Sequence, residues 1–177
     1  SMNGDIDNPP VANGTKVIIS DTDHLCGICG TREFAWKSFL RGENPIFMDP
    51  YIDVYDILDY DINNPNDVSV RRNLGYARNY ANRIDLALAV PCNQKASTGY
   101  CLGYASGSKA EYIVYAPAGG NFSVDLSDTD LELHVEWLNP ADGMIQSAVS
   151  ISGGSANQEF QSPFNNDAVL FLSSVSQ

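Results

Sequence analysis

Polar side chains that could do chemistry follow two short apolar runs in the sequence. Asp21, Asp23 and His24 come directly after the first run, and Asp49 comes directly after the second. Each run has the length and composition of a buried strand, so both groups are expected at strand ends. Carboxylates and an imidazole in such a place can contact a substrate or orient a group that does, cap a turn, or bind a metal ion. The spacing alone leaves these three roles open.

The four cysteines also leave several kinds of chemistry open. Cys26 and Cys29 have the C-x-x-C spacing of redox and zinc sites, but they lie in a glycine-rich loop rather than at the start of a helix. A zinc site of four cysteines would need a second closely spaced pair, whereas Cys92 and Cys101 are nine residues apart. Plain thiols or disulfides are therefore the expected state. A bridge between Cys92 and Cys101 is geometrically feasible, because they flank a predicted turn.

The charge balance restricts the partners of this protein. Its 177 residues include 10 Lys and Arg against 22 Asp and Glu, which makes a formal net charge of −12. So acidic a chain is not expected to bind nucleic acid or an anionic membrane surface. Neutral partners such as carbohydrates are compatible with it. The sequence has no apolar run of the roughly 18 residues that span a membrane, and its first residues lack the features of a signal peptide.

The first half of the sequence predicts alternating strands and helices. Residues 16–20 and 45–48 are expected as strands covered on both faces. Thr31 is placed to cap a helix between them, with Gly42 as its stop. Asp67 is expected to cap a second helix. The apolar side chains of that helix form a one-sided stripe of Val70, Leu74, Ala77, Ala81 and Ile84.

From about residue 86 the sequence changes to short strands separated by turns. Trp137 shares a face with the leucines and valine of its strand and is predicted to lie in the core. Tyr112 and Tyr115 point to opposite faces of one strand, so one of them is expected at the surface or at an interface. Seven strands with tight connections predict a mainly β fold, an antiparallel β-sandwich preceded by an α/β segment. They are expected at residues 99–105, 110–116, 121–125, 131–137, 145–151, 159–161 and 168–172.

Three segments together resemble one enzyme family. They are residues 16–24 (KVIISDTDH), residues 36–51 (WKSFLRGENPIFMDPY), and a block from residues 112–117 (YIVYAP) through 135–143 (VEWLNPADG). In this order they resemble the end of the apiosidase-like glycoside hydrolases. Those enzymes join a TIM-barrel catalytic domain to a C-terminal β-sandwich labelled collagen-binding. The resemblance covers nearly the whole chain from about residue 9, and it departs at Cys26, where an aromatic residue is expected.

The resemblance implies two domains and a set of site residues. Residues 1–85 would be the last two βα units of a barrel, and residues 86–177 the sandwich. Barrel active sites lie at the carboxyl ends of the strands, so the polar groups after the two apolar runs would border the sugar site. The site-bordering candidates are Asp21, Asp23, His24 and Asp49, with Tyr51 and Tyr112 as candidate substrate contacts.

A complete catalytic pair is not predicted in this chain. Glycoside hydrolysis uses two carboxyl groups about 5–10 Å apart across the scissile bond. Asp21 and Asp23 do not simply make that pair, because at least one of them is expected to serve as a cap or an orienting partner. Glu33 and Glu43 flank a helix instead of ending a strand. The sequence lacks phosphate-loop and dinucleotide motifs, and its calcium-like stretch from Asp59 lacks the turn glycine, so no cofactor or metal is predicted.

These observations predict the accessory C-terminal region of a secreted glycoside hydrolase, inactive alone and supporting the catalytic barrel. One alternative is an autonomous module that binds a glycan or collagen. Another is a small hydrolase whose site forms between subunits. The expected partners are carbohydrate or the catalytic part of the parent enzyme, and a homo-oligomer is also compatible with the sequence. The expected location is extracellular or periplasmic.

Overall fold

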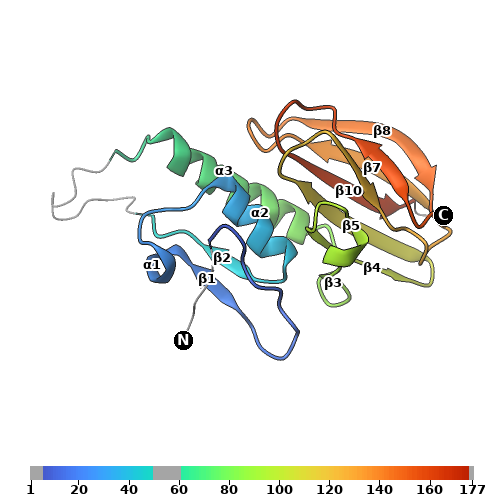
Figure 1. Ribbon diagram of the computed structural model, residues 1–177, viewed down its shortest axis with the longest axis horizontal. Coiled ribbons are helices and arrows are strands. Elements are labelled where there is room, and N and C mark those ends of the chain that lie inside the picture. The colour runs from blue at the N-terminus through green and yellow to red at the C-terminus, as the bar shows by residue number, and fades with distance from the viewer. Residues whose placement is uncertain (1–5, 50–60, 176–177) are drawn as a thin grey trace. The chain divides into compact units, whose positions relative to one another are not determined.

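The computed structural model describes residues 6–49 and 61–175 (Figure 1). The chain divides into two compact units, Ser1–Arg78 and Asn79–Gln177. Tyr51 and the calcium-like stretch that begins at Asp59 lie outside the described residues. Among the helices of the described part, none is long and apolar enough to cross a membrane.

The first unit contains two parallel strands connected through helices. Its elements are β1 (Ile19–Asp21), α1 (Thr22–Leu25), α2 (Arg32–Leu40), β2 (Asn44–Ile46) and most of α3 (Pro65–Ala81). The register pairs Ile19 with Asn44 and Asp21 with Ile46. Parallel strands need a crossover connection, and here the helical segment between β1 and β2 provides it. The predicted order of strand, helix, strand and helix is confirmed.

Helix α2 is held by large side chains on its buried side. Phe34 and Leu40 are buried, and Trp36 is completely buried. The indole Nε1 of Trp36 donates a hydrogen bond of 2.8 Å to Oδ1 of Asn73, which gives this buried N–H a partner. Just after the helix, Gly42 has a φ of 78°, a left-handed conformation that favours glycine and stops the helix as predicted.

Helix α3 begins three residues earlier than a cap at Asp67 predicts, so Asp67 is not its cap. The first residue of the helix is Pro65, whose fixed φ and missing N–H suit the first helical position. The carbonyl oxygen of Asn64 accepts the first helical hydrogen bond, from the N–H of Val68 at 3.0 Å. The predicted apolar stripe is buried at Val70, Ala77 and Ile84, and half-buried at Leu74 and Ala81.

The prediction that both parallel strands are covered on both faces is wrong. The exposed fractions are 79% for Val17, 47% for Ile19, 45% for Ile46 and 39% for Met48, whereas Phe47 is buried at 8%. These values alternate along the chain, because successive side chains of a strand point to opposite faces. One face of the β1–β2 pair is therefore an open apolar surface.

The second unit is an antiparallel β-sandwich. Its strands are β3 (Val90–Pro91), β4 (Cys101–Ser106), β5 (Lys109–Ala116), β6 (Asn121–Val124), β7 (Glu132–Leu138), β8 (Ile145–Ser152), β9 (Gln158–Gln161) and β10 (Ala168–Ser174). Six of them form one sheet in the order β3-β4-β5-β10-β7-β8, and β6 pairs with β9 in a second sheet. All of these pairings are antiparallel, which confirms the predicted fold class. The seven predicted strands are present, and the two-residue β3 was missed.

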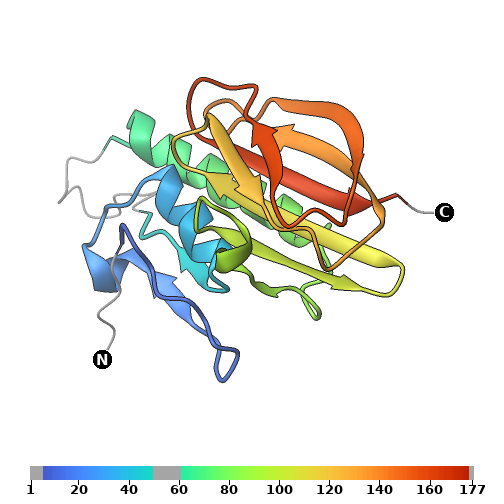
Figure 2. The same ribbon diagram turned by 45° about the vertical axis from the view of Figure 1, so that its right-hand side comes forward.

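The core of the sandwich lies between its two sheets (Figure 2). Phe122 from β6 and Phe160 from β9 stack with ring centroids 5.9 Å apart. Trp137 from β7 meets them edge-on, with its centroid 5.9 Å from Phe122 and 6.4 Å from Phe160. Trp137 is 4% exposed, so its predicted core position is confirmed.

The second face of the six-stranded sheet is buried as well. Tyr112 and Tyr115 both have exposed fractions of 0%, so of the two expected places, the surface or an interface, the surface is wrong. Part of the cover on this face comes from Tyr80, which is in the second unit at the end of α3. Its ring packs edge-on against Phe171 of β10, at 5.5 Å between centroids. The guanidinium of Arg83 lies 4.5 Å from the centre of the same Phe171 ring.

Candidate functional site at the strand ends

The carboxyl ends of β1 and β2 lie together at one edge of the parallel pair. Asp21 ends β1, and Asp49 follows β2 by three residues. The two ends are joined by Thr22, whose buried hydroxyl accepts a 2.8 Å hydrogen bond from the N–H of Met48. This placement is what parallel pairing requires, because parallel strands present their carboxyl ends at the same edge.

Asp21, Asp23 and His24 form a polar cluster at this edge. An oxygen of the Asp21 side chain accepts from the N–H of Asp23 at 3.1 Å and so caps the short helix α1. The imidazole Nδ1 of His24 lies 3.6 Å from Asp21 and 3.9 Å from Asp23. One donor atom of each residue lies within 4.8 Å of the others, close enough for the three to share a cation. The side chains of Asp23 and His24 are exposed, which also leaves them accessible to a substrate.

Asp49 binds a residue outside this polar cluster. Its Oδ2 accepts a charge-assisted hydrogen bond of 2.7 Å from Nε of Arg71 on α3. Another nitrogen of Arg71, Nη1, donates to the carbonyl oxygen of Ile62 at 2.8 Å. Arg71 thus ties the segment after β2 to the helix that follows. This contact was not predicted from the sequence.

The cysteines pair in two disulfides, Cys26–Cys29 and Cys92–Cys101. The predicted bridge between Cys92 and Cys101 is confirmed, with 4.9 Å between their Cα atoms. The four sulfurs are therefore used in pairs, and a disulfide sulfur is not a thiolate ligand for a metal ion.

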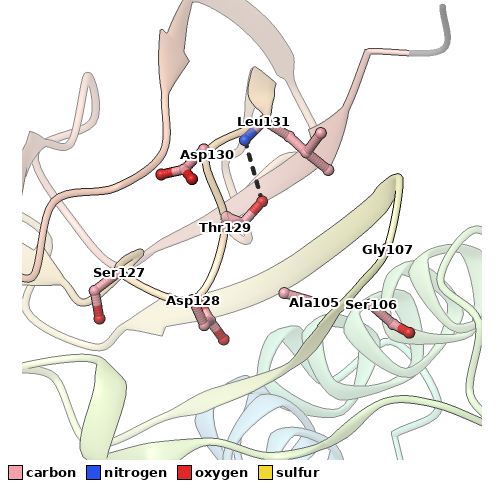
Figure 3. A pocket seen from close by; sticks show the side chains of 8 residues that line it. All are labelled: Ala105, Ser106, Gly107, Ser127, Asp128, Thr129, Asp130 and Leu131. Carbon is pink, nitrogen blue, oxygen red and sulfur yellow. Dashed lines mark hydrogen bonds between the residues drawn. The ribbon is translucent and has the colours of Figure 1, made fainter.

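A polar hollow lies on the sandwich, where the sequence predicted only turns (Figure 3). Its volume is about 340 Å³. One side is formed by residues 105–107 of the β4–β5 hairpin, and the other by residues 127–131. Its lining residues include Asp128, Asp130, Ser106 and Ser127, whose side chains carry carboxyl and hydroxyl groups. Turns are generally polar, so the sequence carried no signal that distinguished this hollow from other loops.

Tyr112 does not line this hollow and is linked to it only by a hydrogen bond to Asp128. Its ring is fully buried in the core, so it offers no exposed face for stacking on a sugar. The hydroxyl donates a 2.6 Å hydrogen bond to Oδ1 of Asp128, and Nζ of Lys95 lies 3.0 Å from Oδ2 of the same carboxylate. Burial, followed by the Asp128 carboxylate, raises the pKa of Tyr112 well above its ordinary value.

Glu43 is a buried carboxyl group directly before β2, at the opposite end of that strand from Asp49. It is 3% exposed, and its Oε2 accepts a hydrogen bond from the hydroxyl of Ser20 on β1. Burial raises the pKa of Glu43, and the hydrogen bonds with Ser20 and Ser38 and the charge of Arg41 only partly oppose that change. The folded protein therefore keeps the proton of Glu43 to a higher pH than the unfolded chain does.

Replacing Glu43 with glutamine is expected to stabilise the first unit at neutral pH. The unfolded chain releases this proton near pH 4.5, so wild-type stability falls as the pH rises from there through the higher folded-state pKa. Glutamine does not ionise. The free energy of unfolding of Glu43→Gln should therefore exceed that of its background by about 1 kcal/mol at pH 7, within the usual cost of burying a polar group. Urea unfolding, followed by Trp36 fluorescence in a Trp137→Phe background, measures it. If the difference in free energy of unfolding between Glu43→Gln and its background is the same at pH 4 and pH 7, the raised pKa of Glu43 is contradicted.

Comparisons with known proteins found one family model that matches part of the second unit. Residues 93–173 match a family model described as "Putative collagen-binding domain of a collagenase". A search of the curated proteins found no significant match.

Two solved structures are similar in fold over 82% of this chain. One is described as a glycoside hydrolase (TM-score 0.60, 16% identity), the other as a glycoside hydrolase family 5 protein from Bacteroides vulgatus ATCC 8482 (TM-score 0.62, 15% identity). The chain spans 36% of the length of each. Most of its sandwich thus resembles the collagen-binding-type domain in sequence, and the chain resembles part of these hydrolases in fold.

Proposed function

We propose that this chain is the accessory C-terminal region of a secreted glycoside hydrolase and that it is catalytically inactive alone. The observation that carries the proposal is the open apolar face of the β1–β2 pair, with Val17, Ile19, Ile46 and Met48 exposed. Parallel strands occur almost only in sheets that are covered on both faces. Two such strands with an uncovered face therefore favour a larger parallel sheet as the complete structure.

In this proposal the first unit supplies the last two βα units of an apiosidase-like TIM barrel. The carboxyl ends of barrel strands carry the active site. Asp21, Asp23, His24 and Asp49 would then border the sugar site, and Tyr51 would contact the substrate. The partner of the chain is the remaining catalytic part of the parent enzyme, whose strands would complete the catalytic pair of carboxyl groups.

The polar groups at the strand ends are compatible with a supporting role. Asp21 caps α1, and Asp49 is held by Arg71, so each carboxylate already has a structural partner. A glycosidase needs one carboxyl group as acid and another as nucleophile or base, held about 5–10 Å apart across a sugar. The structural contacts of Asp21 and Asp49 therefore support the proposal that these aspartates border the site instead of forming its catalytic pair.

The chain alone is expected to show no turnover of a panel of aryl glycosides and oligosaccharides. Release of the aryl group and chromatography of reducing ends provide the measurements. Turnover that disappears in Asp21→Asn would overturn the proposed inactivity. A specific activity that rises with protein concentration would instead support the small hydrolase with a site between subunits.

The hollow beside Asp128 favours a second candidate, an autonomous module that binds a glycan or collagen. Its exposed carboxylates and hydroxyls are groups that form hydrogen bonds with sugar hydroxyls. Calorimetric titration with oligosaccharides and with collagen peptides separates the two functions. Saturable binding that is lost in Asp130→Ala but kept in Asp142→Ala, a control on the β7–β8 turn, would establish the module. Absence of binding at millimolar ligand supports the accessory region.

A further inference from the structure

The two disulfides of this chain differ in their access to solvent. Cys92 and Cys101 are 4% and 0% exposed and belong to the sandwich core. Cys26 is exposed and Cys29 is half-buried, in the loop between α1 and α2. A reductant can therefore approach Cys26 directly, whereas the core must open before it reaches Cys92 or Cys101.

Space around the Cys26–Cys29 loop also favours attack from outside. Gly27 has a φ of 80°, and a Cβ added there would meet no atom within 4 Å. Ile28, the other residue between the cysteines, is 36% exposed although it is apolar. The loop thus borders open space and packs little side-chain surface. Opening its short disulfide ring need not disturb the buried side of α2.

The same loop is attached to the strand-end site. The N–H groups of Cys26 and Gly27 both donate to the carbonyl oxygen of Thr22, each at 2.8 Å. The hydroxyl of Thr22 accepts from the N–H of Met48, and its neighbours Asp21 and Asp23 form the polar cluster. A change in the redox state of the loop therefore occurs beside the polar groups at the end of β1.

We propose that Cys26–Cys29 is a thiol–disulfide exchange site, which a dithiol reduces while the Cys92–Cys101 bridge stays closed. One thiolate of the dithiol attacks Sγ of Cys26, the S–S bond breaks, and Cys29 leaves as a thiolate that takes up a proton. The second thiolate of the dithiol then attacks the first sulfur of the same dithiol, which is bonded to Sγ of Cys26 in the mixed disulfide. Cys26 is released as a thiol, the dithiol becomes a cyclic disulfide, and two electrons have passed to the protein. This inference does not depend on the proposed glycosidase association.

Timed reduction of the intact chain with dithiothreitol tests the proposal. Samples are quenched with an alkylating reagent, and the cysteine peptides are quantified by mass spectrometry. Cys26–Cys29 is expected to be reduced at least tenfold faster than Cys92–Cys101. Its rate should increase linearly with dithiothreitol concentration, because direct attack needs no prior unfolding. Equal rates, the reverse order, or a rate for Cys26–Cys29 that does not depend on dithiol concentration would overturn the proposal.

Single variants test which sulfur is attacked. The Cys26 thiol of Cys29→Ser is expected to react faster with an aromatic disulfide reagent than the Cys29 thiol of Cys26→Ser. The Cys92→Ala/Cys101→Ala variant is the matched control and should keep the wild-type reduction rate at Cys26–Cys29. A Cys29 thiol that reacts as fast as the Cys26 thiol would overturn the assignment of Cys26 as the attacked sulfur.

Discussion

Replacing Trp137 with alanine is expected to lower the free energy of unfolding of the sandwich by about 3–5 kcal/mol. Trp137 is 4% exposed and lies against Phe122 and Phe160, which come from the opposite sheet. Removal of the indole leaves a cavity between two sheets that cannot collapse without disturbing their strand pairing. The lost transfer free energy and the cavity therefore both contribute to the change. Urea unfolding monitored by far-ultraviolet circular dichroism measures it.

Val149→Ala provides the matched control for this variant. Val149 is also an apolar residue of the large sheet, on β8, but it is 86% exposed. Its truncation removes little buried surface and should change the free energy of unfolding by no more than about 0.5 kcal/mol. If Trp137→Ala lowers the free energy of unfolding as little as Val149→Ala does, the two sheets do not pack as described.

Removal of the Cys92–Cys101 disulfide is expected to destabilise the sandwich by about 2–3 kcal/mol, the loop-closure entropy for a loop of this size. The bridge joins the segment after β3 to the first residue of β4, and Cys92 N–H also donates to the Cys101 carbonyl at 2.7 Å. Without it, the unfolded chain gains freedom that folding must remove. The double variant Cys92→Ala/Cys101→Ala, compared with wild type in urea, gives the magnitude.

A matched pair of substitutions distinguishes this effect from a general effect of losing a disulfide. Cys26→Ser/Cys29→Ser removes the bridge of the first unit and should leave the unfolding of the sandwich at its wild-type midpoint. If the Cys92→Ala/Cys101→Ala sandwich unfolds at the wild-type urea concentration, the bridge does not stabilise the native edge of the sheet.

Local patterns predicted most of the sandwich. Alternation along residues 131–137 placed Trp137 in the core, and turn residues marked the ends of all seven strands. These signals are local, since side-chain direction alternates along a strand and tight turns need particular residue types. The β3 strand was not predicted, because a strand of two residues that includes Pro91 has no alternating pattern.

The site was predicted less completely than the fold. The sequence placed Asp21, Asp23, His24 and Asp49 after two strands, and parallel pairing explains why these strand ends lie at one edge. It did not predict that Arg71 would hold Asp49, or that Asp128 would accept from Tyr112 at the hollow. Both contacts join residues at least 16 positions apart, and nothing in either local segment specifies the other.

By itself, the sequence determined the types of the secondary-structure elements, the antiparallel class of the second unit and the feasibility of the Cys92–Cys101 bridge. Only the tertiary structure decided which faces are covered. It buried Tyr112 and Tyr115 together on opposite sides of one sheet, and it left Ile19 and Ile46 exposed although their runs are apolar. The reason is physical: an apolar pattern shows which side chains gain from burial, whereas the cover that buries them comes from segments distant in the chain.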